Sequence, residues 1–226
     1  MTYLLTTKQL QPIVGSYLKK QPNGTLGNIF AVLKSIHITY QQTGDIDDLR
    51  YLLALGIRCR HGRRMPWVGT HVAVSRLISI KILDLSFTDF EALYDYLEQL
   101  LGDITFVRGE LTLYDTAVNI GQLLTPVVVP QSYVYLASGA REGAGYILGN
   151  RNVKRTMPAS IFSPILPGVQ NIDIENMLCI YKSLFKKLSE GKTLSPLEID
   201  QEYNPHGFNP RSKKEYIARL NSIIIP

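Results

Sequence analysis

Apolar residues recur every three or four positions along most of the chain, which is the spacing of an amphipathic α-helix. The pattern predicts a helix over about 26–40 with Thr25 as its N-cap. Asp45 fits the N-cap of a shorter helix that ends at Gly56. Further helices are predicted over the ranges 70–83, 89–101 and 112–125. The first half of the sequence is therefore expected to be helical.

The second half mixes helical spacing with two β-like runs, Val127–Val129 and Tyr133–Leu136. The pattern leaves open whether these runs form a small hairpin or extended linkers. A helix follows over 138–147 with Ser138 as its N-cap. It contains Gly143 and Gly145, and since each glycine costs about 1 kcal/mol relative to alanine, we expect a close backbone approach there.

Two more helices are predicted near the C-terminal end of the sequence. Asp173–Ser189 is the clearest amphipathic pattern and is expected to form one continuous helix. Lys213–Leu220 is expected to form a short final helix. Together these patterns predict an all-α or nearly all-α fold, an irregular helical bundle with at most a small β-hairpin.

The length of 226 residues is expected to form a single helical domain spanning 1–226, with a core that needs neither disulfides nor a structural metal. Hydrophobic residues make up 45% of the chain and charged residues 19%, which excludes the composition of a disordered protein. No apolar run approaches the roughly 20 residues that span a bilayer, and residues 1–20 do not have the order of a secretory signal. Cys59 and Cys179 are expected to be reduced thiols. We therefore expect a cytoplasmic protein without a membrane partner.

The net charge of +5 permits an acidic partner such as nucleic acid. One segment, residues 58–67, concentrates basic and aromatic side chains: Arg58, Arg60, Arg63, Arg64 and Trp67. Such arginines bind phosphates while the tryptophan ring stacks on a base or sugar. The alternative is a solvated loop whose tryptophan anchors it to the core. We expect Arg108 and Arg141 to be further phosphate contacts.

Residues 89–117 weakly resemble a helix–hairpin–helix module, in which a Gly-hydrophobic-Gly turn directs backbone N–H groups at a DNA phosphate. Here Val107 and Arg108 stand where the first glycine and the hydrophobic residue would be, followed by Gly109. A plain connection between two helices is the alternative.

The segment Ser138–Gly145 is a turn of small residues that opens a helix, with Arg141 in its first turn. Such a turn can hold a phosphate or a carboxylate, and tight helix packing through glycine is the alternative. It matches neither a Walker A loop nor a dinucleotide fingerprint. If the fold brought Tyr114, Asp115, Arg141 and Glu142 together, they would form a polar cluster suited to an enzyme.

Metal and cofactor chemistry is not predicted. The four histidines have no short ligand spacing among themselves, and no Cys-x-x-Cys pair occurs. The acidic residues at Asp45, Asp47 and Asp48, and at Asp173 and Glu175, fall at predicted helix starts. There they offset the positive end of the helix dipole.

The strings Tyr114-Asp115-Thr116-Ala117 and Tyr135-Leu136-x-x-Gly139-x-Arg141 resemble a family of uncharacterised bacterial helical proteins. The resemblance implies a prokaryotic or mobile-element context and no particular activity. The sequence thus favours a non-enzymatic binding protein with nucleic acid as its ligand. An accessory or immunity-type protein that binds an acidic protein partner, and an enzyme with a dispersed helical site, are the alternatives.

Overall fold

The computed structural model describes residues 3–21, 25–57, 67–105, 107, 109–203 and 210–223. Within these ranges the protein contains eleven α-helices, two short 3-10 helices and one two-stranded antiparallel sheet. The predicted all-α class is confirmed.

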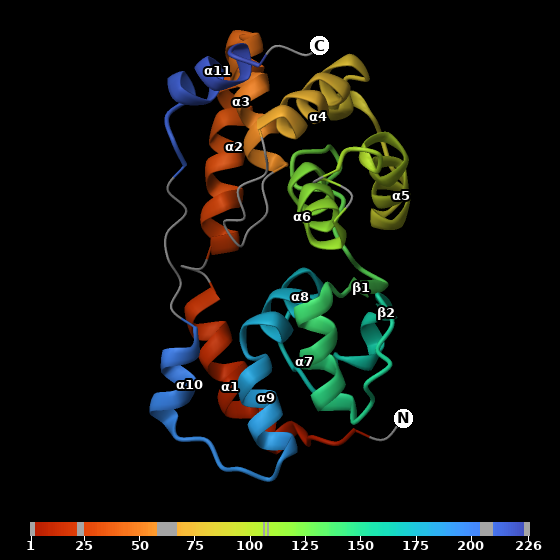
Figure 1. The fold of residues 1–226 in the computed structure, drawn as a ribbon, viewed down its shortest axis with the longest axis vertical. Coiled ribbons are helices and arrows are strands. Elements are labelled where there is room, and N and C mark those ends of the chain that lie inside the picture. The colour runs from red at the N-terminus through yellow and green to blue at the C-terminus, as the bar shows by residue number, and fades with distance from the viewer. Residues whose placement is uncertain are drawn as a thin grey trace. The chain divides into compact units, whose positions relative to one another are not determined.

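The chain folds into two compact units and passes between them three times. Unit 1 consists of Met1–Gly24 and Pro130–His206, and unit 2 consists of Thr25–Val129 and Gly207–Pro226. Each unit therefore joins segments that are far apart in the sequence, as the colours in Figure 1 show. Whether the two units unfold together as one domain is a question of cooperativity, and the single domain stays a prediction.

Among the described residues, unit 1 is built from five α-helices, one 3-10 turn and the small sheet. Its elements are α1 (Thr7–Lys20), β1 (Tyr133–Tyr135), α7 (Ser138–Leu148), β2 (Thr156–Pro158), a 3-10 turn (Ala159–Ile161), α8 (Asn171–Ile180), α9 (Lys182–Ser189) and α10 (Pro196–Glu202). The sequence patterns did not predict α1 or α10. Both begin with a capping box, Thr6 with Gln9 and Ser195 with Glu198, and this signal was present in the sequence.

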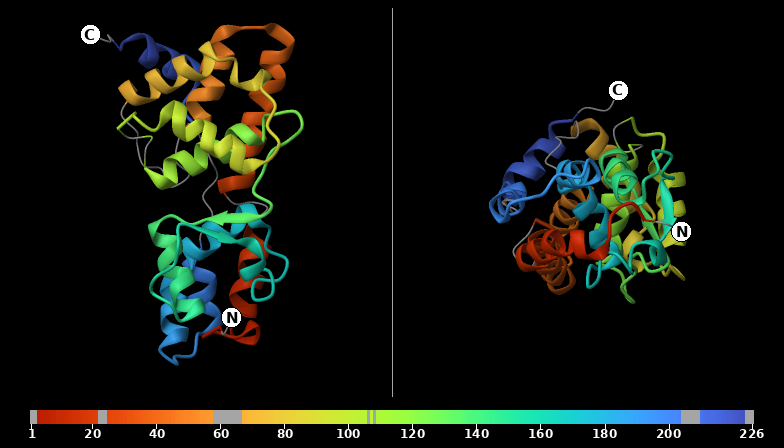
Figure 2. Two further views of the ribbon diagram at one scale, coloured as in Figure 1. Left: turned by 90° about the vertical axis from the view of Figure 1, so that its right-hand side faces the viewer. Right: turned by 90° about the horizontal axis from the view of Figure 1, so that it is seen from below.

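The sheet of unit 1 corrects one alternative of the sequence analysis. Tyr133–Tyr135 does form a strand, but its antiparallel partner is Thr156–Pro158 (Figure 2). In this pair Val134 lies opposite Met157. Val127–Val129 forms no strand. The N–H of Val128 instead donates to the carbonyl of Gly121, which turns the chain at the end of α6 (Glu110–Gly121).

The core of unit 1 lies where α7, α8 and α9 pack side by side (Figure 1). A Cβ atom on Gly143 would collide with the backbone carbonyl of Leu178, and one on Gly139 would lie 2.8 Å from Sγ of Cys179. The expected close backbone approach at Gly143 is therefore confirmed, because only glycine lets α7 come this near to α8.

The predicted continuous helix Asp173–Ser189 is wrong, since it breaks at Tyr181. The backbone of Tyr181 has φ −93° and ψ 12°, which ends α8 and starts α9 in a new direction. The buried Tyr181 ring packs edge-on against Tyr17 and Tyr203, with centroids 6.4 and 6.3 Å away. Periodicity did not reveal the break because apolar residues continue at helical spacing through it.

Unit 2 is a bundle of helices from both of its chain segments. Its elements are α2 (Thr25–Thr43), α3 (Ile46–Gly56), α4 (Trp67–Ser79), a 3-10 turn (Ile82–Asp84), α5 (Phe90–Leu101), α6 and α11 (Lys213–Asn221). The predicted N-cap Asp45 is confirmed, since its carboxylate accepts the N–H of Asp47. The amide of Asn119 donates to the carbonyl of Gly56 at 2.9 Å and so joins α6 to the end of α3.

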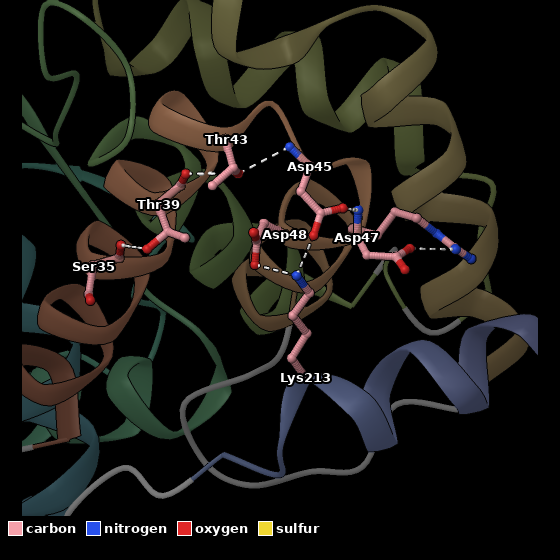
Figure 3. A network of polar contacts seen from close by, with 8 residues as sticks. Ser35, Thr39, Thr43, Asp45, Asp47, Asp48 and Lys213 are labelled. Atoms are coloured by element: carbon pink, nitrogen blue, oxygen red, sulfur yellow. Dashed lines mark hydrogen bonds and ion pairs between the residues drawn. The ribbon is translucent and has the colours of Figure 1, made fainter.

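A polar network attaches α11 to the start of α3 (Figure 3). The Lys213 ammonium lies 2.6 Å from a carboxylate oxygen of Asp45 and 2.7 Å from one of Asp48. Thr43 at the end of α2 accepts the N–H of Asp45 through its hydroxyl oxygen. The consecutive helices α2 and α3 therefore meet the distant helix α11 at one cluster of polar and charged side chains.

Candidate functional site

The predicted basic loop lies mostly outside the described residues. This holds for Arg58, Arg60, Arg63 and Arg64, and also for Arg108. Trp67 is described, and it is the first residue of α4. Its ring packs edge-on against Tyr216 with centroids 5.1 Å apart, and the guanidinium carbon of Arg219 lies 5.4 Å from its centre. The ring thus has packing partners within unit 2, and its contact with nucleic acid stays a prediction.

The hairpin was predicted for the connection between α5 and α6. Val107 stands at the position of the first hairpin glycine, and its side chain is completely buried. Its N–H donates to the carbonyl of Ile104 at 2.9 Å, so this group does not point toward a phosphate. The resemblance to helix–hairpin–helix modules receives no support from this position.

Unit 1 contains an open pocket of about 820 Å³ that collects charged residues from two helices and a loop. α7 contributes Ser138, Arg141, Glu142 and Tyr146. The loop after α7 contributes Arg151 and Asn152, α9 contributes Lys186, and Glu190 directly follows α9. The volume is within the range of small-molecule sites, about 300–1,000 Å³. Of the two predicted nucleic-acid contacts that the structure describes, Trp67 and Arg141, the pocket contains Arg141.

The helical period of α7 explains why the pocket forms. Positions 138, 141, 142, 145 and 146 lie on one face of the helix, and this face lines the pocket. The small residues Ser138 and Gly145 leave room there. On the opposite face Ala140, Ala144 and Ile147 are completely buried in the core of unit 1. The core face thus holds the helix in place while the pocket face stays open.

Both acidic groups in the pocket wall are paired with lysines that do not line it. Glu142 lies 3.0 Å from the ammonium of Lys182 and also accepts a hydrogen bond from the Tyr146 hydroxyl at 3.1 Å. Glu190 lies 2.7 Å from Lys192. The hydrogen bond from Lys182 lowers the pKa of Glu142, and the one from Lys192 lowers the pKa of Glu190. Both carboxylates are therefore ionised and locally neutralised at neutral pH.

Three cations of the wall then set the charge of the pocket: Arg141, Arg151 and Lys186. Arg141 is half-buried, and the other two are exposed. Within the described parts of the chain, neither Arg151 nor Lys186 forms an ion pair. The composition of the units agrees, because unit 1 has 11 basic and 7 acidic residues, a net charge of +4, whereas unit 2 has 13 and 12. The excess positive charge is concentrated in the unit that contains the pocket.

The predicted enzyme cluster is not assembled in this pocket. Arg141 and Glu142 line it, but Tyr114 and Asp115 are buried in α6 of unit 2, where only 2% and 0% of their surfaces are exposed. Arg141 and Glu142 therefore belong to unit 1, whereas Tyr114 and Asp115 belong to unit 2. Among the residues that the structure describes, no group of three or more His, Cys, Asp or Glu side chains is arranged to hold a metal ion.

Of the acidic residues predicted at helix starts, Asp45 before α3 is exposed, whereas Asp173 in α8 is buried. Asp45 caps α3 and pairs with Lys213, as described above. Asp173 lies in the first turn of α8, as expected, but it is buried and accepts a hydrogen bond from the Tyr17 hydroxyl at 3.0 Å. Glu175 is completely buried. Sequence patterns missed the burial of Asp173 because its partner Tyr17 comes from α1, more than 150 positions away.

None of the helices in the described ranges combines the length and apolar character needed to cross a membrane. Comparison with protein-family models, with curated proteins and with solved structures finds no match. The resemblance to bacterial helical proteins therefore stays a prediction, and any function has to be argued from the geometry of the pocket.

Proposed function

We propose that this chain is a non-enzymatic binding protein whose ligand is nucleic acid, held through its phosphates at the pocket of unit 1. The observation that carries the proposal is the gathering of Arg141, Arg151 and Lys186 around one pocket whose carboxylates are already paired. The sequence analysis named Arg141 as a phosphate contact on its own. The pocket adds two cations from positions 10 and 45 residues further along the chain.

The chemistry of these side chains suits a phosphodiester backbone. A guanidinium donates two parallel hydrogen bonds to phosphate oxygens, and an ammonium acts as a compact point charge. Contacts of this kind position a nucleic acid without reading its bases. We therefore expect binding that depends weakly on sequence and strongly on salt. A cytoplasmic location, where nucleic acids are accessible, is part of the same proposal.

The test is a titration of the purified protein with double-stranded DNA, single-stranded DNA and RNA at several salt concentrations. The double variant Arg151→Ala/Lys186→Ala removes two pocket cations. If both contact phosphates of duplex DNA, the slope of log affinity against log salt should become less steep by about 2. The matched control is Lys34→Ala/Lys214→Ala, which removes the same charge from two exposed positions of unit 2.

The two double variants distinguish binding at the pocket from binding to the overall positive charge. Equal weakening by both double variants would assign binding to net charge and would remove the pocket from the proposal. No binding to any of the three nucleic acids at low salt would overturn the function altogether. The triple variant Arg60→Ala/Arg63→Ala/Arg64→Ala tests the basic loop in the same titration, and weakening there would add the loop to the interface.

A further inference from the structure

Unit 1 has a second depression, of about 590 Å³, which the proposed nucleic-acid site does not use. One wall is the exposed face of α1. The other is the end of α9 together with the segment that leads into α10, from Leu188 to Asp200. All of the residues that line it belong to unit 1. We call this depression the α1 groove.

The wall formed by α1 is a stripe with a lysine at each end and small residues between them. Lys8, Pro12, Gly15 and Lys19 follow each other at helical spacing, and all four are exposed. At a rise of about 1.5 Å per residue, the two lysines are separated by about 17 Å along the helix. The opposite face of α1 is buried in the core, so the orientation of the stripe is determined by the fold.

Packing inside the protein does not explain the glycine in the middle of the stripe. Proline and glycine are the two least favourable residues inside a helix. A Cβ atom on Gly15 would meet no atom within 4 Å, in contrast to Gly143, where the backbone of α8 fills the space. A close neighbour within the chain therefore does not require glycine at position 15. An external segment that approaches the backbone of α1 would use the open space beside Gly15.

The opposite wall provides an apolar floor, and it also carries the polar side chains of Lys192 and Thr193. Leu188 and Leu194 are half-buried, and Ile199 is buried at the base of α10. The one carboxylate of the groove, Asp200, lies 2.9 Å from the ammonium of Lys20 and is paired. Within the described ranges, Lys8 and Lys19 form no ion pair. The groove therefore combines an apolar floor with an unneutralised positive charge at each end of one wall.

We propose that the α1 groove binds an extended, acidic segment of a partner protein. Carboxylates about 17 Å apart would pair with Lys8 and Lys19, and this distance corresponds to about five residues of an extended chain. Apolar side chains between them would pack against the floor. Such a floor favours a peptide over nucleic acid, because a sugar-phosphate backbone has little apolar surface to bury against leucine and isoleucine.

The probe is the fluorescein-labelled peptide Glu-Glu-Leu-Pro-Leu-Val-Glu-Glu, titrated with the full chain by fluorescence anisotropy. We expect saturable binding below 1 mM, on the order of magnitude of weak peptide sites. Gly15→Leu places a side chain in the groove, starting from a Cβ position that meets no atom within 4 Å, and should weaken binding at least tenfold. Gly15→Ala, the matched control, should stay within threefold of the natural chain. Lys8→Glu/Lys19→Glu should also weaken binding at least tenfold.

Three results would overturn this proposal: no saturable binding, equal binding by the Gly15→Leu variant, or equal binding of a peptide with lysine in place of each glutamate. The failure of the groove and the failure of the nucleic-acid site are distinguishable, because Gly15→Leu should leave DNA affinity unchanged. If Gly15→Leu weakened DNA binding and not peptide binding, the groove would belong to nucleic acid and not to a protein partner. Circular dichroism of each variant checks that α1 remains folded.

Discussion

The backbone carbonyl oxygen of Leu178 in α8 occupies the space that a Cβ atom on Gly143 of α7 would need. This relationship holds the helix that lines the charged pocket against the buried helix behind it. Neither helix can move away without exposing the core residues that they share, among them Ala140, Ala144 and Met177. The pocket therefore depends on a contact that none of its own lining residues makes.

Replacing Gly143 by alanine should destabilise the protein by about 1–3 kcal/mol, the usual cost of overpacking a closely packed core. The measurement is the free energy of unfolding from a denaturant titration. Gly15→Ala is the matched control, since its Cβ would meet open space. There the better helix propensity of alanine should stabilise the chain by about 0.5–1 kcal/mol. Equal effects of the two substitutions would contradict the close approach of α7 to α8.

Tyr17→Phe should also destabilise unit 1. The Tyr17 hydroxyl donates to Asp173 at 3.0 Å and accepts from the amide of Asn176 at 3.2 Å, in a fully buried position. Burial raises the pKa of Tyr17 above its ordinary value, and the neighbouring Asp173 carboxylate adds to this, so the hydroxyl remains protonated. Its loss removes a donor from a buried carboxylate, which costs about 1–3 kcal/mol. Thermal unfolding should show the effect.

The half-buried Tyr40 of α2 provides the control for Tyr17. Tyr40→Phe removes the same atom from unit 2 and should change stability by less than about 0.5 kcal/mol, as is usual for substitutions outside buried networks. A Tyr17→Phe variant as stable as Tyr40→Phe would show that the buried hydroxyl contributes nothing net.

The start of α10 should resist acid. Glu198 accepts hydrogen bonds from the backbone N–H and the hydroxyl of Ser195 and lies 2.9 Å from Lys187. The backbone hydrogen bond from Ser195, together with Lys187, lowers the pKa of Glu198 from 4.5 to about 2. Because the folded pKa is the lower one, its contribution to stability is complete above pH 4.5 and is lost as the pH falls toward 2.

Carbon-detected NMR titration of the glutamate carboxyls measures this pKa directly. Lys187→Met should raise the pKa of Glu198 and leave the capping box intact. Ser195→Ala removes the hydroxyl and should raise it as well. A carboxyl that titrates near 4.5 in the natural chain would show that the capping box does not persist in solution.

Lys213→Met should loosen α11 from the start of α3, because it removes the partner of both Asp45 and Asp48 (Figure 3). The hydrogen bond from Lys213 lowers the pKa of Asp45. The contribution of the pair is therefore present above the ordinary pKa of Asp45 and is lost as the pH falls through the folded value. At pH 7 the thermal unfolding temperature of the Lys213→Met variant should be lower than that of the natural chain. The difference between the two temperatures should become smaller in acid.

Lys214→Met is the matched control for Lys213→Met. Lys214 is the exposed neighbour on the same helix, and its removal changes the net charge equally. A drop in the unfolding temperature that is the same for both variants, or that persists unchanged at pH 2.5, would show that the ion pairs are not responsible.

Several features of this protein are determined locally and were readable from its sequence. Apolar residues at helical spacing predicted most helices, and Asp45 predicted the start of α3, because a helix and its cap depend on residues within a few positions. Gly143 and Gly145 indicated a close approach for the same reason, since a glycine is unfavourable in a helix unless packing requires it. The all-α class follows from these local signals together.

The tertiary structure decided which of these elements share a surface. Only the fold places Arg151 and Lys186 beside Arg141, pairs Glu142 with Lys182, and sets the exposed face of α1 against the segment before α10. It also separates Tyr114 from Arg141 into different units and breaks the helix at Tyr181. These are contacts between positions far apart in the chain, so the spacing of residues within one segment does not predict them. Local patterns determined the helices of this protein, and long-range packing determined its candidate sites.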